Sequence, residues 1–132
     1  MNERKVKYQK AGGVAAGGPA YKKAYAFALH IIKICEQVRE DKKEFVLSKQ
    51  LLRSATSVGA NLAEAGAAIS GLDLSSKASI AYKECQESKY WISLMADADY
   101  LDHAIADELI SEADEIARIL FSTIRTLRIN NQ

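Results

Sequence analysis

The stretch from Gln50 to Ala65 most strongly constrains the fold, because its residues repeat with helical spacing on three separate faces. One line along this helix is polar and consists of Gln50, Ser54, Ser57, Asn61 and Glu64. A second line, turned by about 100°, is apolar and consists of Leu51, Ala55, Val58, Leu62 and Ala65. The third face carries mostly small side chains: Leu52, Thr56, Gly59, Ala60 and Ala63. A helix with two non-polar faces is expected to be covered from two directions.

Three further segments show amphipathic helical periodicity, and helix-forming residues dominate the composition. The patterns predict helices over about 20–41, 46–68, 73–98 and 106–129, joined by short connectors. Leu74, Ala78, Ala81, Cys85, Ser88, Ile92 and Met95 form the expected core line of the third helix. Leu109, Ala113, Ile116, Leu120, Ile124 and Leu127 form that of the fourth. We therefore predict an all-α fold, an antiparallel up-down-up-down four-helix bundle.

Local residues suggest where these helices begin and end. Pro19 suits the first turn of the first helix, since its missing N–H is not needed there. Ser48 is a plausible N-cap of the second helix, which alternatively begins one turn earlier near Phe45. Gly71 is expected to end that helix with a positive φ. Asp73 or Ser75 is expected to cap the third helix.

Composition excludes several classes of protein. A chain of 132 residues with 48% hydrophobic and 27% charged residues fits a single globular domain. No run of about 18 apolar residues predicts a membrane span, and the N-terminus lacks the apolar core of a secretory signal. Cys35 and Cys85 lie on apolar helical lines and read as buried, reduced thiols. We expect a cytoplasmic protein without membrane contact.

The first helix, like the second, is apolar on more than one side. Tyr21, Tyr25, Leu29 and Ile32 form one line, and Phe27, Ile31, Ile34 and Val38 form another. The core of one bundle needs a single apolar stripe from each helix. The additional apolar face therefore predicts contact between copies of the chain. The predicted oligomer interface consists of Phe27, Ile31, Ile34, Leu52, Gly59, Ala60 and Ala63.

The net charge of +1 hides an asymmetry along the chain. Residues 1–43 hold 10 Lys and Arg against 4 Asp and Glu, whereas residues 44–132 hold 8 against 13. Residues 1–19 read as a flexible, basic, Gly-rich tail, which is either a solvated segment or an arm that contacts phosphate or a partner. In the predicted topology the basic residues gather at one end of the bundle. The possible nucleic-acid contacts are Arg4, Lys5, Lys7, Lys10, Lys22, Lys23, Lys77, Arg125 and Arg128.

Polar residues on the second and third helices predict a shared network. Its expected members are Arg53, Ser57, Asn61, Glu64, Lys83, Glu84 and Glu87. Such groups are costly to bury unpaired, so the network either sets helix register and subunit geometry or forms a ligand or nucleic-acid groove. Tyr90 and Trp91 lie beside it, and they either pack against protein or stack on a base.

The sequence does not predict an enzyme. A di-iron centre in a four-helix bundle uses Glu-x-x-His motifs, but neither His30 nor His103 follows a Glu by three residues. No recognised nucleophile motif or phosphate-binding loop is present in the sequence. We therefore expect no metal and no cofactor.

The residues Arg53 to Ala65 also carry a family resemblance. Gln50, Arg53, Ala55 and Ser57, followed by Asn61 and Glu64, resemble the signature of the 23S rRNA intervening sequence proteins. A second block resembles the third helix of that family: Ala81, Tyr82, Lys83, Glu84, Glu87, Tyr90, Trp91 and Leu94. The resemblance covers roughly residues 21–128, and one departure is Ala65, where many members have Gly.

The resemblance implies a homopentameric ring of four-helix bundles and a link to nucleic acid, since accessory proteins of diversity-generating retroelements are related. Two functions follow. The first is a non-enzymatic homo-oligomer whose basic end contacts RNA or DNA phosphates. The second is an adaptor or scaffold that binds another protein and no nucleic acid. Binding by the first would be non-specific and steeply dependent on salt.

Overall fold

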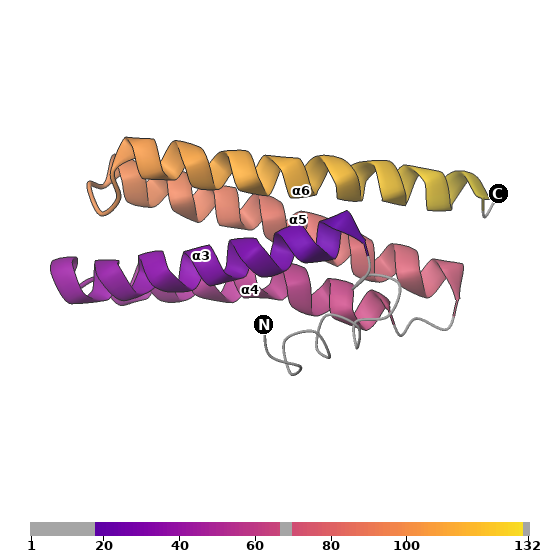
Figure 1. Cartoon of the computed structure of the whole chain (residues 1–132), viewed down its shortest axis with the longest axis horizontal. Helices are drawn as coiled ribbons and strands as arrows, with labels where there is room; N and C mark the ends of the chain where they lie inside the picture. Colours follow the sequence, from indigo (N-terminus) through magenta and orange to yellow (C-terminus); the bar gives the residue numbers. More distant parts are fainter. Residues whose placement is uncertain (1–17, 67–69, 131–132) are drawn as a thin grey trace.

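A computed structural model describes residues 18–66 and 70–130, and these form four α-helices without a strand. The helices are α3 (Pro19–Lys42), α4 (Val46–Ala65), α5 (Gly71–Asp97) and α6 (His103–Asn130). Consecutive helices run in opposite directions (Figure 1). The predicted all-α four-helix bundle is confirmed. No helix among the described residues combines the length and apolarity that crossing a bilayer requires.

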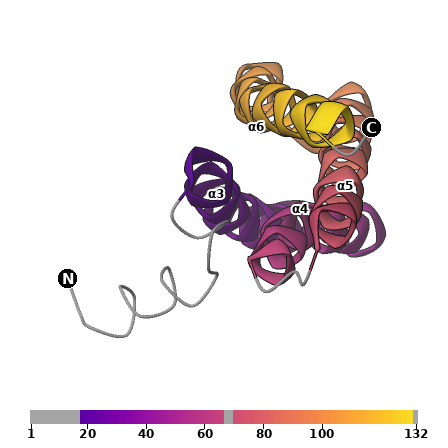
Figure 2. The same cartoon turned by 90° about the vertical axis from the view of Figure 1, so that its right-hand side faces the viewer.

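The helices form an arc in the order α3, α4, α5, α6 when viewed along the bundle (Figure 2). Packing is densest between α4 and α5 and between α5 and α6, and it is sparsest between α3 and α6. At the end where α3 begins, an apolar cavity of about 240 Å³ lies between Pro19, Leu62, Leu74 and Ile119. The seam between α3 and α6 is therefore the weakest of the four helix contacts.

Each helix contributes one buried line to a common core. Leu51, Ala55, Val58, Leu62 and Ala65 are buried on α4, as their spacing predicts. The core lines expected for α5 and α6 are also buried, except that Leu74 and Leu127 are only partly covered. Apolar side chains removed from water stabilise the fold in proportion to their area, so this shared core holds the bundle together.

The first helix uses its apolar faces differently from the prediction. Phe27 and Ile31 are completely buried in the core of the single chain, and Ile34 is nearly so. Leu29, on the other line, is 46% exposed. Because α3 lies against both α4 and α6, its wide apolar face is covered within one chain. The prediction that Phe27, Ile31 and Ile34 form an oligomer interface is wrong.

The small residues of α4 let α3 approach closely. A β-carbon placed on Gly59 would lie 3.8 Å from the β-carbon of Ala24, an ordinary van der Waals contact. Leu52, Gly59 and Ala63 are partly covered, and Ala60 is exposed. The close approach that we expected between copies of the chain occurs at Gly59 within one chain, between α3 and α4.

The connection from α3 to α4 turns within three residues. Lys43 adopts a left-handed conformation with φ of 53°, although it is not a glycine. The helix then begins at Val46, two residues before the predicted N-cap Ser48, which is fully buried inside the first turn. Glu44 takes over the capping role. Its carboxylate accepts hydrogen bonds of 2.9–3.0 Å from the N–H groups of Val46, Leu47 and Ser48.

Gly71 was expected to break the second helix, but it is the first residue of α5. The N-cap of α5 is Ser70, whose hydroxyl accepts a hydrogen bond from the N–H of Asp73 at 3.1 Å. Neither Asp73 nor Ser75 is the N-cap. α4 ends at Ala65, and the predicted extension to residue 68 falls partly on residues 67–69, outside the described part of the chain.

Glu44 makes the stability of this chain depend on pH. Burial raises the pKa of Glu44, but hydrogen bonds from the backbone N–H groups of Leu47, Ser48 and Val46 lower it by more in total. Its pKa therefore lies below its ordinary value of 4.5. A depressed carboxylate pKa stabilises the folded state above the unfolded-state pKa, and this stabilisation is lost as the pH falls through the folded-state pKa.

We predict that Glu44→Gln lowers the free energy of unfolding by about 1 kcal/mol at neutral pH, because the charged cap is removed. In acid the native carboxyl is protonated and resembles the amide, so the difference between the two proteins should vanish. Urea denaturation at both pH values measures this, with exposed Glu40→Gln as the control. An equal difference at neutral and acidic pH would contradict the assignment of Glu44 as a charged cap.

Candidate functional site

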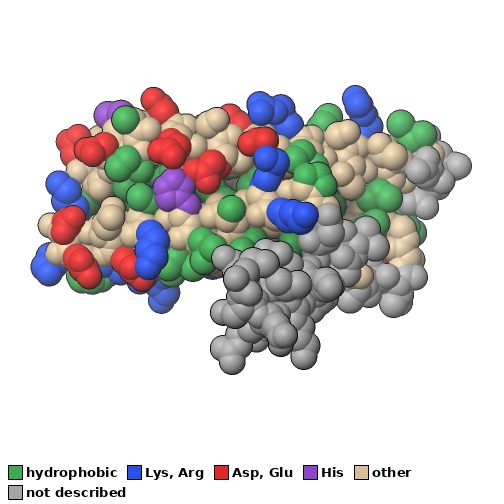
Figure 3. Space-filling model, in the orientation of Figure 1, with side chains coloured by type: hydrophobic (Ala, Val, Ile, Leu, Met, Phe, Trp, Pro, Cys, Tyr) green, Lys and Arg blue, Asp and Glu red, His purple; other side chains and the backbone are tan. Residues whose placement is uncertain are grey.

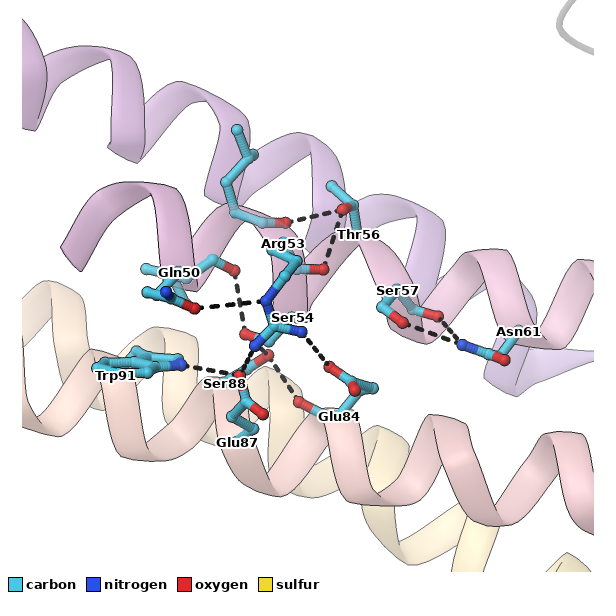
Figure 4. Close-up of polar contacts among 12 residues, drawn as sticks. Gln50, Arg53, Ser54, Thr56, Ser57, Asn61, Glu84, Glu87, Ser88 and Trp91 are labelled. Carbon is cyan, nitrogen blue, oxygen red and sulfur yellow. Dashed lines mark hydrogen bonds and ion pairs between the residues drawn. The ribbon is translucent and has the colours of Figure 1, made fainter. Parts of the chain in front are cut away.

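A polar cluster on the outer surface joins α4 to α5 (Figure 4). Arg53 extends from α4 toward two carboxylates on α5, and its guanidinium contacts Glu84 at 3.5 Å and forms a short ion pair with Glu87. Gln50 accepts a hydrogen bond from Nε of Arg53 at 3.4 Å, and the indole N–H of Trp91 donates to Glu87 at 3.0 Å. The predicted pairing of Arg53 with Glu84 and Glu87 is present in the structure.

A pair of buried serines lies at the same contact between the helices. Ser54 and Ser88 have no exposed surface, and their hydroxyl oxygens are 3.0 Å apart. Ser88 also lies 2.8 Å from the carbonyl oxygen of Glu84, and Ser54 lies 3.2 Å from that of Leu51. Every buried side-chain polar atom among the described residues has a hydrogen-bond partner, so this contact is polar but fully satisfied.

The other predicted members do not join this cluster. Asn61 donates through its amide to the backbone oxygen and hydroxyl of Ser57, at 2.8 and 3.0 Å, so both residues bond within α4. Glu64 pairs with Lys77 at 2.9 Å, closer to the end of the bundle. Lys83 is exposed and forms no ion pair within the described residues. The predicted network is therefore divided into separate contacts along the helix pair.

This cluster is suited to fixing helix register. Arg53 keeps 51% of its side chain exposed, so solvent screening limits the strength of its ion pairs.

No reactive thiol accompanies the Arg53 cluster. Burial raises the pKa of Cys35 to about 11 and that of Cys85 to about 12, so both thiols are protonated at neutral pH and chemically inert.

The predicted basic contacts among the described residues lie toward the end where α3 and α5 begin and α6 ends (Figure 1), but Lys and Arg side chains are also exposed at the opposite end (Figure 3). Two of the predicted contacts are neutralised, since Lys23 pairs with Glu115 at 2.7 Å and Lys77 pairs with Glu64. Lys23 holds the pKa of the Glu115 carboxyl below its usual value. The exposed cations of this end are Lys22, Arg125 and Arg128. Arg4, Lys5, Lys7 and Lys10 lie outside the described residues.

Sequence reasoning missed one cluster, at the seam between α3 and α6. Nδ1 of His30 lies 2.7 Å from a carboxylate oxygen of Glu112. One ligand atom from each of His30, Glu108 and Glu112 lies within 4.8 Å of the others. The Glu-x-x-His pattern could not reveal this cluster, because His30 is 82 residues from Glu112. The sequence signal that could have revealed the cluster is a pair of carboxylates spaced i,i+4 on one helix, opposite a His on the antiparallel neighbouring helix.

The outer side of α5 carries an exposed apolar line. Leu72, Ile80, Tyr90 and Leu94 are 71, 39, 58 and 37% exposed. At about 100° per residue, these positions fall within roughly 80° of one another on the helix, and Ser76, Lys83 and Glu87 share that strip. Trp91, next to Tyr90, is partly buried and packs against the core. A helix face that mixes exposed apolar and aromatic side chains with polar ones is compatible with a protein interface.

We predict that Glu87→Ala shifts the fluorescence of Trp91, the single Trp of the chain, to longer wavelength. The reason is that the indole N–H loses its carboxylate partner and becomes accessible to water. The free energy of unfolding should fall by less than about 1 kcal/mol, because the ion pair with Arg53 is exposed. Glu84→Ala is the matched control, and unchanged emission in Glu87→Ala would show that the described indole contact is wrong.

Comparison with known proteins identifies the family. Residues 19–122 match the model of the family described as 23S rRNA-intervening sequence protein. A crystal structure of a protein of unknown function from the S23 ribosomal protein family of Bacteroides thetaiotaomicron superposes with a TM-score of 0.78 at 37% sequence identity. The match covers 80% of this chain and 97% of that one.

No functionally curated protein matches this chain. The family match spans α3, α4, α5 and most of α6, and includes the Arg53 cluster, the buried serine pair and the apolar line of α5. These findings agree with the resemblance carried by Gln50, Arg53, Asn61 and Glu64. The chain belongs to the 23S rRNA-intervening sequence protein family.

Proposed function

We propose that this protein is a non-enzymatic subunit of a homo-oligomer that brings several basic bundle ends together to bind the phosphates of RNA or DNA. The observation that carries the proposal is the group of exposed cations Lys22, Arg125 and Arg128 at one end of the bundle. The basic tail is attached to the same end, where α3 begins. One chain offers few cations, so repetition in a ring would be needed for useful affinity.

The apolar line on α5 supports self-association. A second copy that covered Leu72, Ile80, Tyr90 and Leu94 would remove four partly or largely exposed apolar side chains from water. The partly or fully exposed α4 residues Leu52, Ala60 and Ala63 remain a second predicted contact surface. The family resemblance supports a pentamer. Free, buried Cys35 and Cys85 support the proposal of a reducing, cytoplasmic location.

We expect the double substitution Leu72→Glu and Tyr90→Glu to dissociate the oligomer into folded monomers, because it places charge in the apolar contact. Native mass spectrometry and size-exclusion chromatography measure this. Ser111→Glu, at an exposed position on α6, adds charge outside the line and should leave the oligomer intact. The α5 interface is excluded if the unsubstituted chain is a monomer at low concentration, or if the double variant stays assembled.

For nucleic acid, we expect the double substitution Arg125→Glu and Arg128→Glu to weaken binding of single-stranded RNA and to flatten its salt dependence. The slope of log affinity against log salt should fall by roughly 0.7–0.9 for each cation that no longer binds a phosphate. Lys49→Glu, an exposed position at the opposite end of the bundle, is the control. No binding of RNA or DNA by the parent at low salt would overturn the proposal.

The alternative function is a protein adaptor, and one feature favours it. From Asp97 to Glu115 the chain carries eight acidic residues and no Lys or Arg. This acidic end is exposed at the turn between α5 and α6 (Figure 3). A basic protein partner would dock there through complementary charge. An intact oligomer that fails to bind RNA or DNA at low salt is the result that would favour this function.

A further inference from the structure

The cluster of His30, Glu108 and Glu112 bridges the two neighbouring helices of the arc that pack most sparsely. His30 comes from the middle of α3, and the two carboxylates come from successive turns of α6. The ligand atoms of all three lie within 4.8 Å of one another. In the space-filling view a His side chain lies among acidic side chains between α3 and α6 (Figure 3). Three convergent donor groups from two elements define a position for one small ion.

Charge favours a cation at this position. The nearest Lys side chains along α3 are engaged with other acids, since Lys23 pairs with Glu115 at 2.7 Å and Lys33 pairs with Glu36 at 3.8 Å. Glu108 forms no ion pair or hydrogen bond with any residue in 18–66 or 70–130. The two carboxylates lie within 4.8 Å of each other and of a His30 ring nitrogen. A divalent ion would neutralise both charges, which a single protonated imidazole does not do.

Burial strengthens the argument. The His30 and Glu112 side chains are 31% and 32% exposed, so both are partly removed from water. Neighbours of the cluster along the two helices, Ile31, Leu109 and Ala113, are fully buried and apolar. Like charges repel more strongly beside an apolar surface than in water, because the local dielectric constant is lower. A cation between the exposed Glu108 and the partly buried Glu112 would offset their repulsion.

We propose that His30, Glu108 and Glu112 bind one divalent transition-metal ion such as Zn²⁺, which ties α3 to α6. One imidazole nitrogen with two carboxylate oxygens is a donor set that Zn²⁺, Mn²⁺, Fe²⁺ and Co²⁺ accept, whereas Mg²⁺ and Ca²⁺ prefer oxygen alone. Bonds of roughly 2.0–2.2 Å place tetrahedral donors about 3.4 Å apart, so a small side-chain adjustment closes the site. Water would complete the coordination.

The proposed role of the ion is structural. It would bridge the seam where α3 and α6 share the sparsest packing, next to the Lys23–Glu115 ion pair that already crosses this seam. A ligand that binds the folded state alone stabilises it by mass action, so stability should increase with metal concentration. This inference is independent of the proposed binding of nucleic acid.

The test uses the full chain, purified without a histidine tag and stripped of metal. Titration with Zn²⁺ should show one ion bound per chain, and Co²⁺ should give visible absorption typical of coordinated Co²⁺. Thermal unfolding followed by circular dichroism should shift to higher temperature with Zn²⁺. Glu108→Gln and His30→Gln should each weaken Zn²⁺ affinity on the order of 10-fold to 100-fold and remove the thermal shift.

Glu108→Gln is the decisive variant, because Glu108 is exposed and its substitution should leave the metal-free fold unchanged. His103→Gln and Asp107→Asn are matched controls, a His and an acid at exposed positions of α6 outside the cluster. They should retain the affinity and thermal shift of the parent. The proposal is overturned if Zn²⁺ does not saturate at one site, or if Glu108→Gln binds and is stabilised as well as the parent.

Discussion

The coverage of α4 on two sides is the constraint on which the rest of the structure depends. Its apolar line, including Leu51, Ala55 and Val58, is completely buried in the shared core. Gly59 lies against Ala24 of α3, while Ser54 meets Ser88 of α5. Because small side chains occupy both contact faces, α3 and α5 can both approach closely. The order of helices in the arc follows from these two contacts.

The sparse seam between α3 and α6 is the consequence of that arrangement. Once α3 is held against α4, and α6 against α5, the fourth contact is left to side chains that reach across it. Two polar pairs cross it, Lys23 with Glu115 and His30 with Glu112. Ion pairs of this exposure contribute little to stability. The seam is therefore the part of the bundle whose strength a bound ion would change most.

The proposed functions depend on surfaces of the bundle. The Arg53 cluster sets the register of α4 and α5, and the apolar line beside it carries Leu72, Tyr90 and Leu94. Lys22, Arg125 and Arg128 are exposed at one end, and the acidic turn between α5 and α6 lies at the other, where Lys42, Lys43 and Lys49 are exposed as well.

The sequence by itself determined the helices and three of the four core lines, because helical periodicity is local and α4, α5 and α6 each bury one clear stripe. It also placed Arg53 opposite Glu84 and Glu87. Tertiary structure alone decided which apolar line of α3 faces inward. Phe27 and Leu29 lie on different lines and are both apolar, but only Phe27 is covered by the neighbouring helices. It also decided that His30 meets Glu108 and Glu112, because that meeting depends on the packing of two antiparallel helices distant in sequence.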